Sequence, residues 1–201
     1  MNITKAKVVG LTGGLGSGKS VVRRMLEDLK IPCIDVDTVV RAIHQNATHP
    51  ATTEIARVFP YAINEDACLS RGSLRTVFAL DRKANKHLQA ILKPYVLAQM
   101  LKWTAQQSSA YVVWESALII EVCIPVDRVL MISANLTLQV DRVKEKNPDW
   151  SETQICRVLA LQLGQKKRKI QADDVISNVG TLKNLQQQVE MQHRQYLTLW
   201  T

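Results

Sequence analysis

A glycine-rich segment near the start of the chain constrains the fold more than any other feature. The segment from Gly13 to Ser20 reads Gly-Gly-Leu-Gly-Ser-Gly-Lys-Ser and matches the pattern GxxxxGK followed by Ser or Thr. It follows a short apolar run, Lys7 to Leu11, and precedes Val21 to Leu29, where apolar residues recur at helical spacing. Glycines let backbone N–H groups close around an anion, and a helix start adds positive potential. The order strand, loop, helix therefore predicts a phosphate-binding loop.

The residue types within this loop indicate separate tasks. We expect Lys19 to reach the outer phosphates of a nucleotide and the Ser20 hydroxyl to bind Mg²⁺. ATP and Mg²⁺ are thus the expected cofactors. The alternative is a flexible glycine turn followed by a lysine that happens to start a helix. The loop residues that we expect around the nucleotide are Gly13, Gly14, Leu15, Gly16, Ser17, Gly18, Lys19, Ser20 and Val21.

The rest of the chain alternates strand and helix patterns. The further strand candidates are Ile31 to Asp37, Tyr111 to Trp114, Arg128 to Ser133 and Asp174 to Ser177. Ser151 and Gln154 form a capping-box signal for a helix that we expect to reach Gln171. A closing helix is expected from the apolar spacing between Leu182 and Leu199. This alternation predicts an α/β fold, a parallel sheet with helices on both faces, of the P-loop NTPase type.

Charge and cysteine spacing limit the function classes. The net charge is +8, from 26 basic and 18 acidic residues, which favours anionic partners. Because the only basic run is Lys166 to Lys169 and no aromatic residues interleave it, small phosphorylated ligands explain the charge as well as nucleic acid does. No pair of cysteines has zinc-binding or redox spacing, so reduced thiols are expected; the cysteines are Cys33, Cys68, Cys123 and Cys156.

Two segments bear on location. The residues before the loop are too few and too glycine-rich for the apolar region of a signal peptide, so we expect no export. The most apolar later stretch, Tyr111 to Val126, is interrupted by Glu115 and Glu121, and no membrane span is expected. A cytoplasmic protein is the resulting expectation.

Acidic residues follow two of the expected strands. Asp35 and Asp37 are two apart, so on a strand they would leave on the same side, at the end where ligands of parallel sheets collect. One of them could accept a substrate hydroxyl proton, and Arg41 could hold a second anionic group. The alternative is a pair of solvated acids that cap the next helix. Glu115 stands where P-loop enzymes place an acid that orients magnesium through water, or it is merely solvated, and Glu121 is equally ambiguous.

Taken together, these segments resemble the dephospho-coenzyme A kinase family across almost the whole chain. The opening segment identifies only P-loop enzymes, whereas the aspartate pair and the segment Ala172 to Gly180 narrow the resemblance to this family. The segments that match the family pattern are Gly10 to Ser20, Ile34 to Arg41, Arg71 to Phe78, Arg142, Arg157 with Gln162, and Ala172 to Gly180.

The resemblance implies transfer of the ATP γ-phosphoryl group to the ribose 3′-hydroxyl of dephospho-coenzyme A, the last step of coenzyme A biosynthesis. By the same resemblance, Lys19, Asp37 and Arg142 are the expected catalytic residues, and Asn178 and Gly180 join the nucleotide site. The residues that the resemblance assigns to the acceptor substrate are Asp35, Arg41, Arg71, Lys93 and Glu121.

The resemblance also implies how the chain is divided. We expect a core in residues 1–37, 108–140 and 172–201, a helical acceptor-binding insertion in residues 38–107, and a basic lid in residues 141–171. The lid would close over ATP, exclude water and supply Arg142. Lys93, Ala117 and Lys146 depart from the family pattern, in which histidine, proline and arginine are usual. A lysine keeps the cation but loses the planar fork of arginine.

Two other functions remain open at this point. A nucleoside or nucleotide kinase would share the loop and the lid, but not the aspartate pair joined to a long helical insertion. A non-catalytic P-loop protein associated with nucleic acid would use the basic surface and bind oligonucleotides with a steep salt dependence. Dephospho-coenzyme A is the expected partner, without nucleic acid or membrane. The sequence leaves the oligomeric state open.

Overall fold

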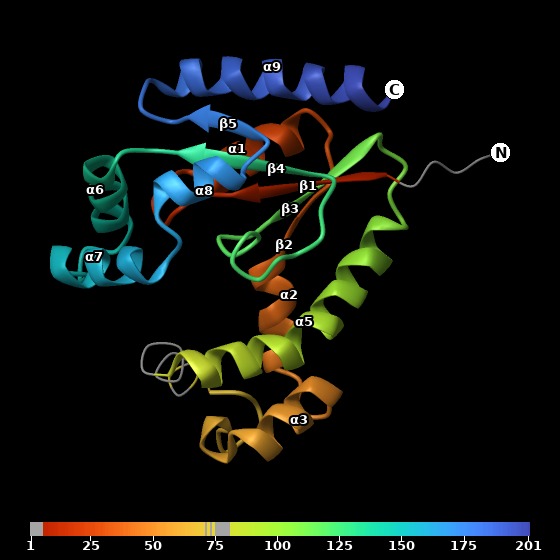
Figure 1. The fold of residues 1–201 in the computed structure, drawn as a ribbon, viewed down its shortest axis with the longest axis vertical. Coiled ribbons are helices and arrows are strands. Elements are labelled where there is room, and N and C mark those ends of the chain that lie inside the picture. The colour runs from red at the N-terminus through yellow and green to blue at the C-terminus, as the bar shows by residue number, and fades with distance from the viewer. Residues whose placement is uncertain (1–5, 71, 73, 75–80) are drawn as a thin grey trace. The chain divides into compact units, whose positions relative to one another are not determined.

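The computed structural model describes residues 6–70, 72, 74 and 81–201, and its centre is a five-stranded sheet (Figure 1). β1 pairs in parallel with β3 and β4, and β4 pairs in parallel with β5. The strand order is β2-β3-β1-β4-β5, so the strand that leads into the glycine-rich loop is central. The α/β fold expected from the sequence is confirmed. The strands are β1 (Lys7–Thr12), β2 (Cys33–Asp35), β3 (Tyr111–Glu115), β4 (Arg128–Ser133) and β5 (Asp174–Ser177).

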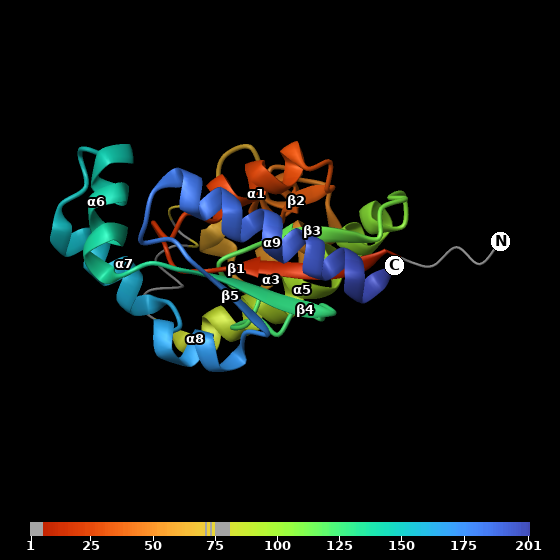
Figure 2. The same ribbon diagram turned by 90° about the horizontal axis from the view of Figure 1, so that it is seen from above.

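Successive side chains along each strand point to opposite faces of the sheet, and different elements cover the two faces. One face packs against α1 (Lys19–Asp28) and α9 (Leu182–Trp200), which lie beside each other (Figures 1 and 2). On the other face, α8 (Gln165–Gln171) contacts β4, and Ile119 and Val126 lie over Gly10. The apolar core of the first face consists of Val9, Leu11, Val22, Leu26, Ile31, Tyr111, Val113, Leu130, Ile132, Ile176, Leu185, Val189 and Tyr196.

Two more helices follow β4. α6 (Leu136–Lys146) and α7 (Glu152–Leu161) pack side by side through Val140, Val143 and Ile155 (Figure 1). The capping box predicted at Ser151 is confirmed. The single helix expected from Ser151 to Gln171 is wrong, because the chain is extended at Gln162 and α8 starts only after Gly164.

The chain forms two compact units, residues 1–34 with 104–201 and residues 35–103. The second unit is helical in its described part, apart from one isolated bridge between Ile63 and Leu69. Its bounds lie close to those expected for the helical insertion. Its helices are α2 (Val36–His44), α3 (Pro50–Val58), a 3₁₀ turn (Pro60–Ala62) and α5 (Arg82–Thr104).

The second strand ends earlier than the sequence pattern suggests. It stops at Asp35, and Val36 already belongs to α2. The reason is a helix cap, because the Asp35 side chain accepts a hydrogen bond from the Asp37 backbone N–H at 2.9 Å. The prediction that Asp35 and Asp37 leave the same side of a strand is therefore wrong. Among the described residues, no helix is long and apolar enough to cross a membrane.

Candidate nucleotide-binding site

The glycine-rich loop adopts a conformation that its glycines permit. Gly16 and Gly18 have φ angles of 73° and 98°, in the left-handed region where other residues are strained. A Cβ at Gly16 would collide with the backbone oxygen of Gln139, and one at Gly18 with the side-chain amide of Asn178. Backbone angles and close packing thus both require glycine at these two positions.

The lysine of the loop is held over the loop itself. The Lys19 Nζ donates hydrogen bonds to the backbone oxygens of Gly13 at 2.9 Å and Gly14 at 3.3 Å. The Ser17 N–H donates to the Gly14 oxygen at 3.1 Å and closes a turn between them. Lys19 and Ser20 are also the first residues of α1, so the ammonium, the hydroxyl and the positive end of the helix share one place.

Asn178 joins the loop to the far edge of the sheet. Its side-chain N–H donates to the Ser17 oxygen at 2.8 Å, and its backbone N–H donates to the Ser133 oxygen at 2.7 Å. Arg142, on α6, donates through Nη2 to the Asn178 backbone oxygen at 3.1 Å and to its Oδ1 at 3.4 Å. Three residues expected at the nucleotide, from distant parts of the sequence, are therefore in one hydrogen-bonded chain. Gly180 lies two residues further along, ahead of α9.

Two glutamines contact the loop, and the sequence motif does not indicate either. Gln139, on α6, packs its backbone against Gly16 and its side chain against Gly14. Gln162 accepts a hydrogen bond from the Leu15 N–H at 2.9 Å across 147 residues of sequence. Sequence patterns placed Gln162 in the helix expected from Ser151 to Gln171 and in the family resemblance, and they did not indicate Gln139. α6, whose second half was expected to belong to a lid, thus begins beside the loop.

Glu115 is buried at the end of β3 and forms an ion pair that the sequence did not reveal. Its Oε2 lies 2.6 Å from Nε of Arg23 on α1, and Arg23 also pairs with Glu27 at 2.9 Å.

Burial, reinforced by the charge of Glu27, raises the pKa of the nearby Cys33 thiol to about 12. Cys33 is therefore a protonated, unreactive thiol at neutral pH.

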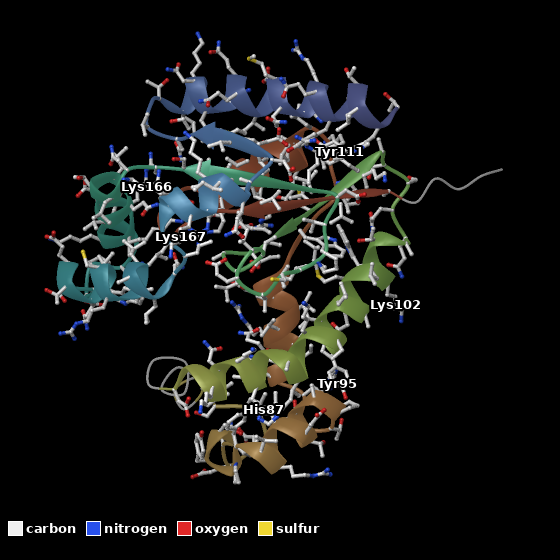
Figure 3. All side chains as sticks on the ribbon, viewed as in Figure 1. His87, Tyr95, Lys102, Tyr111, Lys166 and Lys167 are labelled. Carbon is white, nitrogen blue, oxygen red and sulfur yellow. The ribbon has the colours of Figure 1, made fainter. Side chains whose placement is uncertain are left out.

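Glu121 lies in the segment after β3, where it contacts α8 and the chain before it. Its Oε1 accepts hydrogen bonds from Nη2 of Arg168 at 2.7 Å and from the Leu163 N–H at 3.1 Å. Arg168 is only 2% exposed, so this buried guanidinium ties the middle of α8 to the segment after β3. The exposed charge of α8 comes from Lys166 and Lys167 (Figure 3) and from Lys169. The expected contact of Glu121 with substrate stays a prediction.

The residues expected at the acceptor belong to the helical unit. Asp37 and Arg41 are exposed and four residues apart on α2, as expected, while Asp35 caps that helix. Lys93 is half-buried on α5, directly before Pro94. Arg71 lies outside the described residues. The roles expected for these five residues at the acceptor stay predictions.

The site offers oxygen ligands that suit magnesium. Hydroxyl and carboxylate oxygens, as on Ser20 and Glu115, are the ligands that Mg²⁺ prefers, and Mg²⁺ is usually held jointly with substrate phosphates. The described residues contain no group of three or more His, Cys, Asp or Glu side chains that could hold a metal ion by itself. The oxygens of Ser20 and Glu115 are of the kind that binds Mg²⁺ together with the phosphates of a nucleotide.

Comparison with known proteins gives a consistent result. The family model described as dephospho-CoA kinase matches residues 7–184. The dephospho-CoA kinase of Hahella chejuensis is 33% identical over 198 residues, covering 97% of this chain and 94% of its own. The dephospho-CoA kinase of Chromobacterium violaceum is 35% identical over 198 residues, covering 94% of both chains.

Solved structures agree on the fold. A protein from Thermus thermophilus superposes with a TM-score of 0.83 at 25% identity, covering 96% of this chain and 98% of that one. The dephospho-CoA kinase of Campylobacter jejuni has a TM-score of 0.57 at 16% identity, covering 96% and 98% of the two chains. A shikimate kinase from Acinetobacter baumannii has a TM-score of 0.51 at 16% identity, covering 96% and 94%. The last two likenesses concern the fold alone.

Proposed function

The chain belongs to the dephospho-CoA kinase family of ATP-dependent kinases, and we propose that it transfers the γ-phosphoryl group of ATP to the ribose 3′-hydroxyl of dephospho-coenzyme A. The products are ADP and coenzyme A. The observation that carries the proposal is the loop from Gly13 to Ser20, placed between β1 and α1, with Asn178 bonded to it and Arg142 bonded to Asn178. The match of the family model over residues 7–184 supports the acceptor.

The nucleotide half of the reaction is assigned to this loop. Phosphoryl transfer depends on positioning and on neutralising charge more than on covalent chemistry. Lys19 and the backbone amides of the loop between Gly13 and Val21, apart from the Leu15 N–H that Gln162 accepts, hold the phosphates, and Asn178 with Gly180 borders the nucleotide. Arg142 adds a second cation from α6, and the segment 141–171 acts as the lid that excludes water. The bond from Arg142 to Asn178 supports this assignment by placing the guanidinium beside the loop.

Magnesium is the proposed metal, and Ser20 its ligand from the protein. When bound with ATP, Mg²⁺ supplies positive charge that neutralises the phosphate oxygens. Glu115 would act through water, and its ion pair with Arg23 means that Arg23 competes with the metal for this carboxylate. Arg23 thereby reduces the negative charge that Glu115 can present to the metal.

The acceptor half is assigned to the helical unit. Asp37 accepts the proton of the 3′-hydroxyl, which an exposed carboxylate at neutral pH can do. Asp35, Arg41, Arg71 and Lys93, together with Glu121, bind the remainder of dephospho-coenzyme A. We also propose a cytoplasmic location, which suits cysteines without zinc-binding or redox spacing in the sequence.

An ADP-release assay with three acceptors tests the proposal. The wild-type protein is given ATP and Mg²⁺ with dephospho-coenzyme A, adenosine or AMP, and Lys19→Ala serves as the blank. We expect ADP release to depend on dephospho-coenzyme A, with coenzyme A as the second product. Faster turnover with adenosine or AMP would instead identify a nucleoside or nucleotide kinase.

A further inference from the structure

The connection between α7 and α8 contacts the middle of the phosphate-binding loop. Gln162, directly after the last residue of α7, accepts the Leu15 N–H through Oε1 at 2.9 Å. Leu15 lies between Gly14 and Gly16 in the loop. Because glycine-rich backbone has many accessible conformations, each bond that fixes such a loop removes disorder that a ligand would otherwise have to remove.

Gln162 is itself held firmly on both sides. The residue before it ends α7, whose Ile155 is fully buried against α6. The residue after it, Leu163, donates its N–H to Oε1 of Glu121 at 3.1 Å. The same oxygen accepts Nη2 of the buried Arg168 at 2.7 Å, so Glu121 anchors the chain immediately beyond Gln162.

The other side of the loop is also packed. The side chain of Gln139 lies so close to Gly14 that a Cβ there would be 3.0 Å from its Nε2. Gln139 thus restricts the loop sterically, and Gln162 restricts it through a hydrogen bond. A loop held in this way can present its remaining N–H groups to phosphate with little rearrangement. Hydrogen-bond donors that are already oriented bind an anion more strongly because no free energy is spent on reorganising them.

We propose that Gln162 is a positioning residue for ATP, which holds the Leu15 N–H and keeps the phosphate-binding loop in its binding conformation. Glu121 and Arg168 act through it by anchoring Leu163. This inference rests on the proposed function in so far as the loop binds ATP. It gives Glu121 an anchoring role on the nucleotide side of the reaction, in addition to its proposed contact with the acceptor.

The test combines amide hydrogen exchange of Leu15 by NMR with ATP binding by calorimetry. Gln162→Ala removes the acceptor oxygen, and Gln162→Asn withdraws it by one methylene. Gln162→Glu keeps an acceptor oxygen on a side chain of the same length. In the first two we expect Leu15 to exchange about fivefold faster or more, and ATP to bind about fivefold more weakly, as for loss of one hydrogen bond. In Gln162→Glu the slow exchange should be retained. Gln171→Ala, an exposed glutamine at the end of α8, is the matched control.

Steady-state kinetics separate positioning from other roles. Gln162→Ala should raise the KM for ATP while kcat and the KM for dephospho-coenzyme A stay within twofold of the wild type. Glu121→Ala should speed Leu15 exchange and raise the KM for ATP in the same manner. If Glu121→Ala raises only the acceptor KM, the anchoring role is wrong.

The outcomes distinguish this inference from the proposed function. Leu15 exchange and ATP affinity equal to those of the wild type in both Gln162→Ala and Gln162→Asn would overturn the role of Gln162. Failure of the wild-type protein to bind ATP would overturn the proposed function, whereas faster Leu15 exchange without any nucleotide would still show that Gln162 holds the loop. Circular dichroism confirms that each variant is folded.

Discussion

The two regions that carry the expected chemistry are held in different ways. The phosphate-binding loop is fixed by partners far away in sequence: Asn178 lies 161 residues from Ser17, and Gln162 lies 147 residues from Leu15. The acid pair on α2 depends on a contact across only two residues, from the Asp37 N–H to the Asp35 side chain. The loop is thus a product of tertiary structure, and the acid pair a product of local structure.

The nucleotide half of the proposed site is therefore organised by the fold before any ligand binds. The loop lies among buried contacts, so substitutions there should affect both stability and nucleotide binding. Asp37 and Arg41 are exposed on a capped helix, so substitutions there should affect chemistry and leave the fold nearly unchanged. The following predictions test the two halves against each other.

The largest effect is expected for Lys19→Ala. Removing the ammonium over the loop should lower kcat by about a thousandfold, as for loss of a donor that stabilises transition-state charge. The ADP-release assay measures it, and Lys183→Ala on the exposed face of α9 is the control. Activity within threefold of the wild type would contradict the assignment of the loop to ATP.

Asp37→Asn should lower kcat by about a hundredfold, because the change removes a proton acceptor and keeps the size of the side chain. The backbone N–H that Asp35 caps is unaffected, so the melting temperature should not move. ATP affinity, measured by calorimetry, should also stay the same. Asp66→Asn, an exposed aspartate of the same unit, controls for charge. A variant with full turnover and weakened ATP binding would place Asp37 at the nucleotide instead.

Gly16→Ala tests how the loop is built. The left-handed backbone and the approach of the Gln139 oxygen should together cost about 2 kcal/mol of unfolding free energy. Urea unfolding measures the cost, and ATP binding should weaken in parallel. Gly164→Ala is the control, since a Cβ there meets nothing within 4 Å. Equal stability of both variants would show that the loop is not constrained at Gly16.

The smallest effect is expected for Asp35→Ala, which removes the cap of α2. The loss should be about 1 kcal/mol in unfolding free energy, the usual cost of losing an N-cap. Asp35→Asn keeps a capping side chain and should restore most of the stability. If both variants lose several kcal/mol, the acid pair is held by more than its local cap, and the contrast with the loop is lost.

Much of the fold and half of the site could be predicted from local patterns. β4 and β5 begin and end where their apolar runs predicted, and the family and the kinase class predicted from the motifs are confirmed. Gly16 and Gly18 illustrate why local patterns were sufficient there. A positive φ is a property of a single residue, so a short sequence pattern that contains glycine can predict it. Alternation within a strand is equally local.

The features that the sequence left open depend on distant partners. No pattern around Glu115 shows that Arg23 pairs with it, and no motif at Gln139 places that residue against Gly16. The boundary between β2 and α2 was missed because an aspartate such as Asp35 is equally compatible with a strand end and with a helix N-cap. Only the folded backbone distinguishes the two.

Patterns in the sequence predicted the phosphate-binding loop, the five strands and the family. The contacts around the loop appear only in the folded chain: Asn178 bonds to Ser17, Arg142 bonds to Asn178, and Gln139 and Gln162 reach the loop from α6 and the end of α7. Backbone preferences act over a few residues, whereas the contacts of the loop with Asn178, Gln139 and Gln162 exist only after folding brings together segments more than a hundred residues apart.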